Sequence, residues 1–184
     1  FGCITPFLQI GGDASSREGW RIAVSMLYGQ LKDREAAMEM IGKLGLCSEQ
    51  DAKVQMTMAD RKINAVMSTS AGRLFDGVSA ILGIRKASTF EGEASMALEF
   101  AAEAYEKKYQ NAVDLQNVMD EMRKQFSLAA CIDNKESESA ESNKPEQVKA
   151  VLNTGALVKA IAEARIAGED TEKLAYFFHW ILAE

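Results

Sequence analysis

The sequence predicts a mostly α-helical protein, and three observations support that prediction. No proline occurs between Pro6 and Pro145, and proline is the residue that most strongly disrupts a helix interior. Alanine, methionine, leucine, glutamate and lysine dominate that span, and all are good helix formers. Apolar residues also recur at helical spacing. The clearest such stripe contains Leu174, Phe177, Phe178, Ile181 and Leu182.

Composition narrows the classes of function. The chain has 184 residues, of which 47% are hydrophobic, enough for one domain with a buried core. Its net charge of −6 argues against nucleic-acid binding, and its apolar runs fall short of the about 20 residues that cross a bilayer. The scattered Cys3, Cys47 and Cys131 fit reduced thiols. We therefore expect a cytoplasmic protein that binds neither nucleic acid nor membrane, with no metal site of its own.

The amino-terminal segment Phe1–Ile10 is expected to be extended, because it is partly β-branched and contains Pro6. It has no partner strand nearby in sequence, so we expect its sheet to lie outside this chain. A first helix should follow over about Ser15–Gln30. Arg17 and Arg21 form a like-charged i,i+4 pair on it, which is tolerated where each arginine has an acidic or anionic partner. Surface charges paired elsewhere in the fold would also explain them.

Capping residues predict two more helices. Asp33 can begin a helix that ends at Gly45, and Ser48 with Asp51 resembles a capping box for a helix over about Glu49–Ile63. The residues expected on the buried face of the latter are Val54 and Met58.

The carboxy-terminal half is predicted to continue in helices. One follows Glu91–Glu93 and ends at about Tyr109, and another covers Val113–Phe126. Residues 127–132 and 147–152 can pair as short strands, and the polar stretch between them, about 133–146, is expected to be a mobile acidic loop. Asn153 or Thr154 and then Asp170 cap the last two helices. The chain thus begins in an expected strand and stops in a helix, so it looks like part of a larger protein.

A central helix between Ser68 and Gly83 carries the most unusual pattern. One side is apolar, whereas another side presents Gly72, Asp76, Ser79 and Gly83, with one carboxylate and almost no bulk. Glycine inside a helix costs about 1 kcal/mol relative to alanine. Two explanations stay open at this point: a ligand approaches this face, or a neighbouring helix packs closely against it with Asp76 at the edge.

Other chemical motifs are missing from the sequence. There is no Ser/His/Asp or Cys/His set, no Gly-Lys phosphate loop and no metal-ligand spacing. The single histidine, His179, fits a hydrogen-bonded structural role on the last helix better than a catalytic one.

Several segments resemble the HypF carbamoyltransferases, which mature [NiFe] hydrogenases. The resemblance covers nearly the whole chain apart from residues 110–143, and it departs from the usual family residues at Gly19, where proline is common, and at Glu93, where glutamine is common. The matching segments are Gly11–Ala23, Thr69–Ile84, Phe90–Glu99 and Phe177–Glu184.

The resemblance implies that residues 1–184 are the helical lobe of an actin/sugar-kinase-like domain, which is similar to the tRNA threonylcarbamoyladenosine transferases. The family uses ATP and carbamoyl phosphate to carbamoylate a partner maturation protein, HypE. Its metal ligands, for a divalent ion or zinc, would lie outside this chain, so the segment alone is expected to be inactive.

The resemblance also favours the ligand explanation for the central helix. It implies that Asp76 lies at a nucleotide site, where its carboxylate accepts hydrogen bonds from a ribose or an adjacent hydroxyl group. Gly72 would leave room for the nucleotide, and Gly92 and Glu93 would line its base or ribose side. Two alternatives remain: a noncatalytic helical module that contacts a partner protein, and a related O-carbamoyltransferase that acts on a small molecule.

Overall fold

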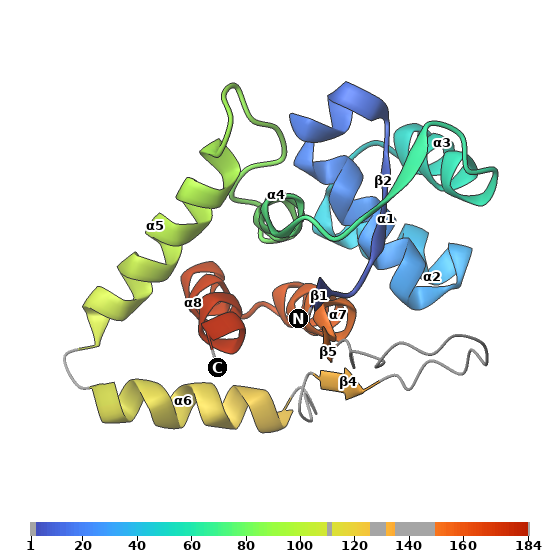
Figure 1. Ribbon diagram of the computed structural model, residues 1–184. Coiled ribbons are helices and arrows are strands. Elements are labelled where there is room, and N and C mark those ends of the chain that lie inside the picture. Colours follow the sequence, from blue (N-terminus) through green and yellow to red (C-terminus); the bar gives the residue numbers. More distant parts are fainter. Residues whose placement is uncertain (1–2, 110–111, 126–131, 135–149, 184) are drawn as a thin grey trace, which may run out of the picture.

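The computed structural model describes residues 3–109, 112–125, 132–134 and 150–183, and helices dominate these ranges (Figure 1). The mostly helical prediction is therefore confirmed. The helices are the 3₁₀ helix η1 (Gly12–Ser16), α1 (Gly19–Leu31), α2 (Arg34–Leu44), α3 (Glu49–Asp60), α4 (Ala71–Ile81), α5 (Glu93–Lys108), α6 (Ala112–Gln125), α7 (Thr154–Ile166) and α8 (Thr171–Ala183). The strands are β1 (Cys3–Ile4), β2 (Phe7–Ile10), β3 (Ala65–Ser68), β4 (Ile132–Asn134) and β5 (Ala150–Leu152).

Local signals placed several helix starts correctly. The side chains of Asp33, Ser48 and Asp170 each accept a hydrogen bond from the backbone N–H three residues later, at 2.9, 3.1 and 2.9 Å. Asn153, rather than Thr154, caps α7. These bonds satisfy N–H groups that have no partner inside the helix, which is why cap residues can be read from sequence.

The strands differ from expectation, because the amino-terminal segment finds its partners within the chain. β2 pairs antiparallel with β3, from Phe7 opposite Ser68 to Ile10 opposite Ala65, and β1 pairs parallel with β5. The expectation that this sheet lies outside the chain was wrong, and β3 was not predicted. Four residues carry too weak a pattern to identify a strand whose partner lies more than 50 residues away.

Two further strands fall near the predicted pair. β4 runs antiparallel to β5, with Ile132 opposite Leu152. Asp133 and Asn134 therefore belong to a strand rather than to the predicted loop. The rest of the predicted loop and strands, at residues 127–131 and 135–149, lies outside the described residues, as does Phe126 at the predicted end of the preceding helix.

Helix α3 turns a different face inward from the one predicted. Val54 is 48% exposed, whereas Ala52, Gln55 and Met56 are buried. Gln55 can occupy the interior because its amide donates to the carbonyl oxygens of Ile10 and Arg21, at 3.2 and 3.3 Å. A buried polar group that finds such partners defeats a prediction based on apolar spacing alone.

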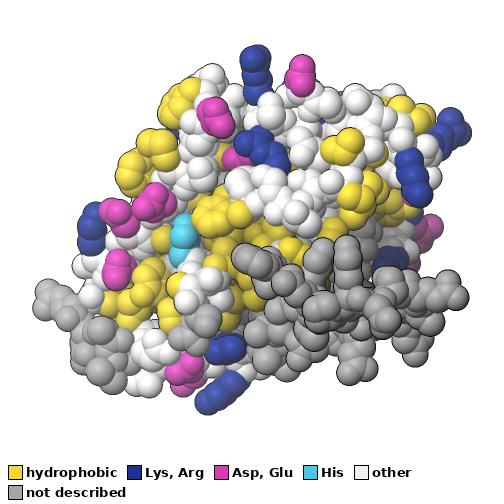
Figure 2. Space-filling view, in the orientation of Figure 1, with side chains coloured by type: hydrophobic (Ala, Val, Ile, Leu, Met, Phe, Trp, Pro, Cys, Tyr) yellow, Lys and Arg dark blue, Asp and Glu magenta, His cyan; other side chains and the backbone are white. Residues whose placement is uncertain are grey.

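Helix α1 lies at the centre of the amino-terminal half, where it contacts α2, α3, α4, α7 and β2 (Figure 1). In the other half α5 packs against α8 and α4, and α6 packs against α8. His179 on α8 takes the expected structural role: its Nδ1 lies 2.8 Å from the carbonyl oxygen of Ala175, and its ring meets the edge of Phe75 on α4 at 5.4 Å. Figure 2 shows hydrophobic side chains gathered around this histidine. Among the described residues no helix has the length and apolar character needed to cross a membrane.

The contact between α1 and α4 is unusually close because it contains glycines. A Cβ at Gly77 would lie 2.5 Å from Met26 Cε and 3.1 Å from Ile22 Cγ2. A Cβ at Gly19, the first residue of α1, would lie 2.7 Å from the backbone oxygen of Asp76. At Gly77, then, the neighbour that approaches the helix is α1. Gly72 differs, because it is exposed in the first turn and a Cβ there would meet only Ser70 Oγ, at 3.8 Å.

We predict that Gly77→Leu lowers the free energy of unfolding by about 1–3 kcal/mol, because the added side chain would overpack the contact with α1. Gly42→Leu is the matched control: Gly42 is also helical, but a Cβ there meets nothing within 4 Å. Urea unfolding of both variants provides the measurement. Equal stabilities would show that α1 and α4 are not in close contact.

Candidate functional site

Helix α4 buries Asp76 at the point where α1 begins. The residue is 6% exposed, and a Cβ at Gly19 would lie 3.5 Å from Asp76 Cβ. Burial penalises an ionised carboxylate because it removes water that would otherwise solvate the charge. Such a group needs a counter-charge and hydrogen-bond donors from the protein or from a ligand.

Arg73, one helical turn before Asp76, is that counter-charge, but its guanidinium is shared. Its Nη1 lies 3.1 Å from Asp76 Oδ2 and donates a 2.6 Å hydrogen bond to the carbonyl oxygen of Ser16. Asp76 Oδ2 is left without a hydrogen bond of good geometry from any described residue. Burial raises the pKa of Asp76, and the positive charge of Arg73 offsets only part of that rise. A carboxylate perturbed in this way is a candidate functional group.

A cavity of about 370 Å³ adjoins this pair. The residues that line it are Ser16, Arg17, Arg73, Thr89, Phe90 and Glu91. Arg17 has no side-chain hydrogen bond or ion pair with the described residues, and Phe90 is 55% exposed. Two guanidinium groups at one cavity suit a phosphate or another multivalent anion, because each can donate two parallel hydrogen bonds. An exposed aromatic ring beside them offers a surface on which a base can stack.

Gly92 and Glu93 directly follow Glu91, the last of the lining residues in the chain. Gly92 adopts a left-handed conformation, with φ of 83°, and begins α5. The Glu93 carboxylate accepts hydrogen bonds from the Thr89 N–H and hydroxyl groups, at 2.6 and 2.9 Å, and lies 3.4 Å from Arg85. These bonds to Thr89 lower the pKa of Glu93. The described contacts of Glu93 therefore hold the loop that carries Phe90.

None of the four predicted site residues lines the cavity, but each adjoins a lining residue in the chain or bonds to one. Gly72 precedes Arg73 in the chain, Asp76 pairs with Arg73, Gly92 follows Glu91 and Glu93 holds Thr89. Whether any of them contacts a nucleotide stays a prediction. The structure adds three side chains that the sequence argument did not place in the site. These are Arg17, Arg73 and Phe90.

The like-charged spacing of Arg17 and Arg21 was a partial signal for one of these residues. Arg21 is neutralised by Glu18 at 2.5 Å and donates to Gln55. Arg17 has no such partner within the described ranges, which is the situation that an anionic ligand would relieve. The described parts of the chain contain no group of three or more histidine, cysteine or acidic residues arranged to hold a metal ion.

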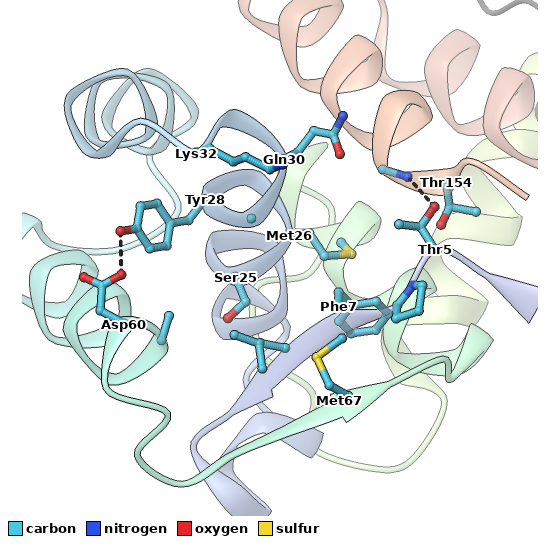
Figure 3. A pocket seen from close by; sticks show the side chains of 15 residues that line it. Thr5, Phe7, Ser25, Met26, Tyr28, Gln30, Lys32, Asp60, Met67 and Thr154 are labelled. Atoms are coloured by element: carbon cyan, nitrogen blue, oxygen red, sulfur yellow. Dashed lines mark hydrogen bonds between the residues drawn. The ribbon is translucent and has the colours of Figure 1, made fainter. Parts of the chain in front are cut away.

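A second and larger cavity lies along the carboxy-terminal half of α1, beside the β2–β3 ribbon (Figure 3). None of its lining residues was singled out as a site from the sequence, because the cavity is formed by segments that are far apart in the chain.

Comparison with known proteins gives a consistent result. The family model described as "Carbamoyltransferase, Kae1-like Domain, second subdomain" matches residues 1–184. "Probable carbamoyltransferase HypF" of Methanocaldococcus jannaschii is 26% identical over 176 residues, which are 96% of this chain and 18% of that protein. "Carbamoyltransferase HypF" of Rhodobacter capsulatus is 39% identical over 100 residues, which are 54% of this chain and 13% of that protein.

Two solved structures share the fold. The crystal structure of T. kodakarensis HypF matches with a TM-score of 0.63 and 19% identity, over 98% of this chain and 20% of that one. Full-length HypF in a phosphate- and nucleotide-bound form matches with a TM-score of 0.62 and 19% identity, over 100% of this chain and 20% of that one. The chain therefore spans about a fifth of the length of these proteins.

We predict that Asp76→Asn raises the melting temperature at pH 7. Because burial raises the pKa of the folded carboxyl, its protonation favours folding below the unfolded value of about 3.9, and this contribution is lost as pH rises through the folded pKa. The neutral amide avoids that loss, so the gain should disappear below about pH 4. Thermal melts across this range, with the exposed Asp114→Asn as control, provide the measurement. A lower melting temperature for Asp76→Asn at pH 7 would contradict it.

Proposed function

Because this chain belongs to the HypF carbamoyltransferase family, as the second subdomain of its Kae1-like domain, we propose that it is the helical part of the transfer domain of an ATP-dependent carbamoyltransferase. The chain spans about a fifth of its relatives, so the activity proposed is that of the whole protein. In that protein the chain would form one wall of a nucleotide site. Any metal that the reaction needs would be held by residues outside this chain.

The finer proposal follows the chemistry that the family resemblance implies. Carbamoyl phosphate, ATP and water would give a carbamoyl-adenylate with release of phosphate and pyrophosphate. The carbamoyl group would then pass to a HypE-like partner with release of AMP. On that partner the carbamoyl group would become a cyanide ligand of a [NiFe] hydrogenase. We propose a cytoplasmic location, because the scattered cysteines fit reduced thiols.

One observation supports the site most directly: the buried Asp76 carboxylate, only partly satisfied by Arg73, adjoins a cavity lined by two arginines. A ribose hydroxyl group could donate to Asp76 Oδ2 and supply the bond that the protein leaves unmade. Arg17 and Arg73 would then bind phosphate oxygens. The Asp76 carboxylate would not contact phosphate itself, because like charges repel. One of the HypF structures with this fold is phosphate- and nucleotide-bound, which supports the proposal.

The remaining predicted residues would contribute open space, backbone N–H groups and support for a loop, and not direct side-chain contacts. Gly72 is open to solvent, so it would leave room for the nucleotide. Gly92 precedes the first turn of α5, whose N–H groups suit a polar ligand. The Glu93 carboxylate would act indirectly, because it holds Thr89 and the loop beside it.

A noncatalytic interaction module is the second candidate function, and exposed apolar residues favour it. Phe90, in the loop before α5, is 55% exposed, and Met96 and Phe100, on α5, are 44% and 61% exposed. Loss of partner binding without loss of nucleotide binding in Phe100→Ser would identify this surface as a partner site.

In the full-length protein we predict that Asp76→Ala weakens nucleotide binding or carbamoyl transfer roughly 10- to 100-fold, because a hydrogen bond to a charged group contributes about 1.5–3 kcal/mol. Arg17→Ala should reduce nucleotide binding while leaving the melting temperature unchanged, because its side chain has no described partner to lose. Calorimetric titration and a transfer assay measure both effects.

The control is Glu121→Ala, which removes an exposed carboxylate from α6, far from the cavity in the sequence. It should leave nucleotide affinity and transfer unchanged. A stable Asp76→Ala protein with full activity would refute the role of Asp76. Full nucleotide affinity in Arg17→Ala would show that this cavity does not bind the nucleotide.

A further inference from the structure

The cavity along the carboxy-terminal half of α1 has a volume of about 490 Å³, within the usual range for small-molecule sites (Figure 3). The elements that enclose it are α1, the end of α3, the β2–β3 ribbon, and the start of α7 with the turn between β1 and β2. It is separate from the arginine-lined cavity, because the two share no lining residue.

One part of its wall is apolar. Figure 3 shows Met26 from α1, Phe7 from β2 and Met67 from β3 on the same side of the cavity. Leu8 and Pro6 complete this part of the lining. Methionine side chains are flexible and polarisable, so they adapt to flat rings and branched groups alike. This part of the wall therefore suits the apolar body of a small molecule.

Another part of the wall carries hydrogen-bond donors. Lys32 and Gln30, at the end of α1, both belong to the lining, and Figure 3 shows Gln30 extending toward Thr154 at the start of α7. Neither Lys32 nor Gln30 has a side-chain partner among the described residues. The start of α7 adds the positive end of a helix dipole, which favours an anion. Its N–H groups contribute less, because those of Gly155 and Ala156 already donate to Thr5 Oγ1 and Asn153 Oδ1, at 3.5 and 3.1 Å.

The acidic group of the lining does not oppose an anion strongly. Asp60 is the carboxylate in the wall, and it accepts hydrogen bonds from Tyr28 at 2.7 Å and from Arg34 at 2.9 Å. Arg34 therefore neutralises that charge, whereas the charge of Lys32 is left uncompensated within the described ranges. The balance in the cavity is positive.

Ser25 is an independent sign of a ligand. It is 5% exposed, it belongs to the lining, and its Oγ has no hydrogen-bond partner among the described residues. A buried hydroxyl group without a partner costs about 1–3 kcal/mol, which a ligand in the cavity could recover. Figure 3 places this side chain between the Tyr28–Asp60 pair and the apolar wall.

We propose that this cavity binds a small organic carboxylate with an aromatic or branched apolar body. The body lies against Met26, Phe7 and Met67. The carboxylate faces Lys32 and the start of α7, and a polar substituent on the body bonds Ser25. This site is independent of the nucleotide site proposed above.

The first test compares 2-naphthoate with its neutral amide, 2-naphthamide, by calorimetric titration of the 184-residue chain. We expect one saturable site for the acid, with a dissociation constant below about 1 mM. The amide should bind about threefold more weakly or worse, the scale that a partly exposed ion pair supports. Equal affinities for the two probes, or no saturable binding of the acid, would overturn the proposal.

Matched variants locate the binding. Gly29 lines the cavity in mid-helix, and a Cβ there would meet nothing within 4 Å. Gly29→Leu should therefore fill the mouth of the cavity without strain and abolish binding. Gly42→Leu, at an equally open helical glycine on α2, should bind normally. Full binding by a folded Gly29→Leu protein, checked by circular dichroism, would overturn the assignment.

The charge is tested separately. Lys32→Gln should abolish the preference for the acid over the amide. Lys62→Gln is the control, because Lys62 has the same left-handed backbone, with φ of 52° against 54°, but lies outside the cavity. A preference that survives in Lys32→Gln would refute the placement of the carboxylate.

Discussion

Helix α4 can lie directly against α1 because glycine occupies the contact on both helices. Gly77 lets the side chains of Ile22 and Met26 reach the backbone of α4, and Gly19 lets the Asp76 carbonyl group approach the start of α1. This approach buries Asp76 under α1 and directs Arg73 toward Ser16. The arginine-lined cavity follows from that arrangement.

The buried pair is a poor arrangement for stability alone. A single guanidinium serves both a carboxylate and a backbone carbonyl group, and the carboxylate oxygen it faces keeps no well-aligned hydrogen bond from the described residues. An apolar residue at position 76 would avoid the cost of burying a charge. Natural proteins accept such costs where a site needs the group. The energetic argument and the family resemblance therefore point to the same residue by separate routes.

Most of the helices could be predicted because their signals come from residues close together in the sequence. Caps such as Asp33 and stripes such as that of α8 depend on neighbours within one or two turns. The predictions failed where distant segments decide. β3 exists because β2 pairs with it, and Gln55 is buried because Ile10 and Arg21 accept its amide hydrogens.

The same reasoning explains what was found and missed at the site. The small face of α4 drew attention to Asp76, but its glycines serve different ends: Gly77 accommodates α1, whereas Gly72 is open. No pattern within one helix could show that Phe90 reaches the cavity beside Arg17. The like-charged spacing of Arg17 and Arg21 was the sequence signal that pointed to this cavity. Several lysines of this acidic chain pair with a carboxylate four residues away on their own helix, as Lys43, Lys53 and Lys107 do. Arg17 and Lys32 are cations that instead line cavities without a described partner, so an anion bound in either cavity would supply the missing counter-charge.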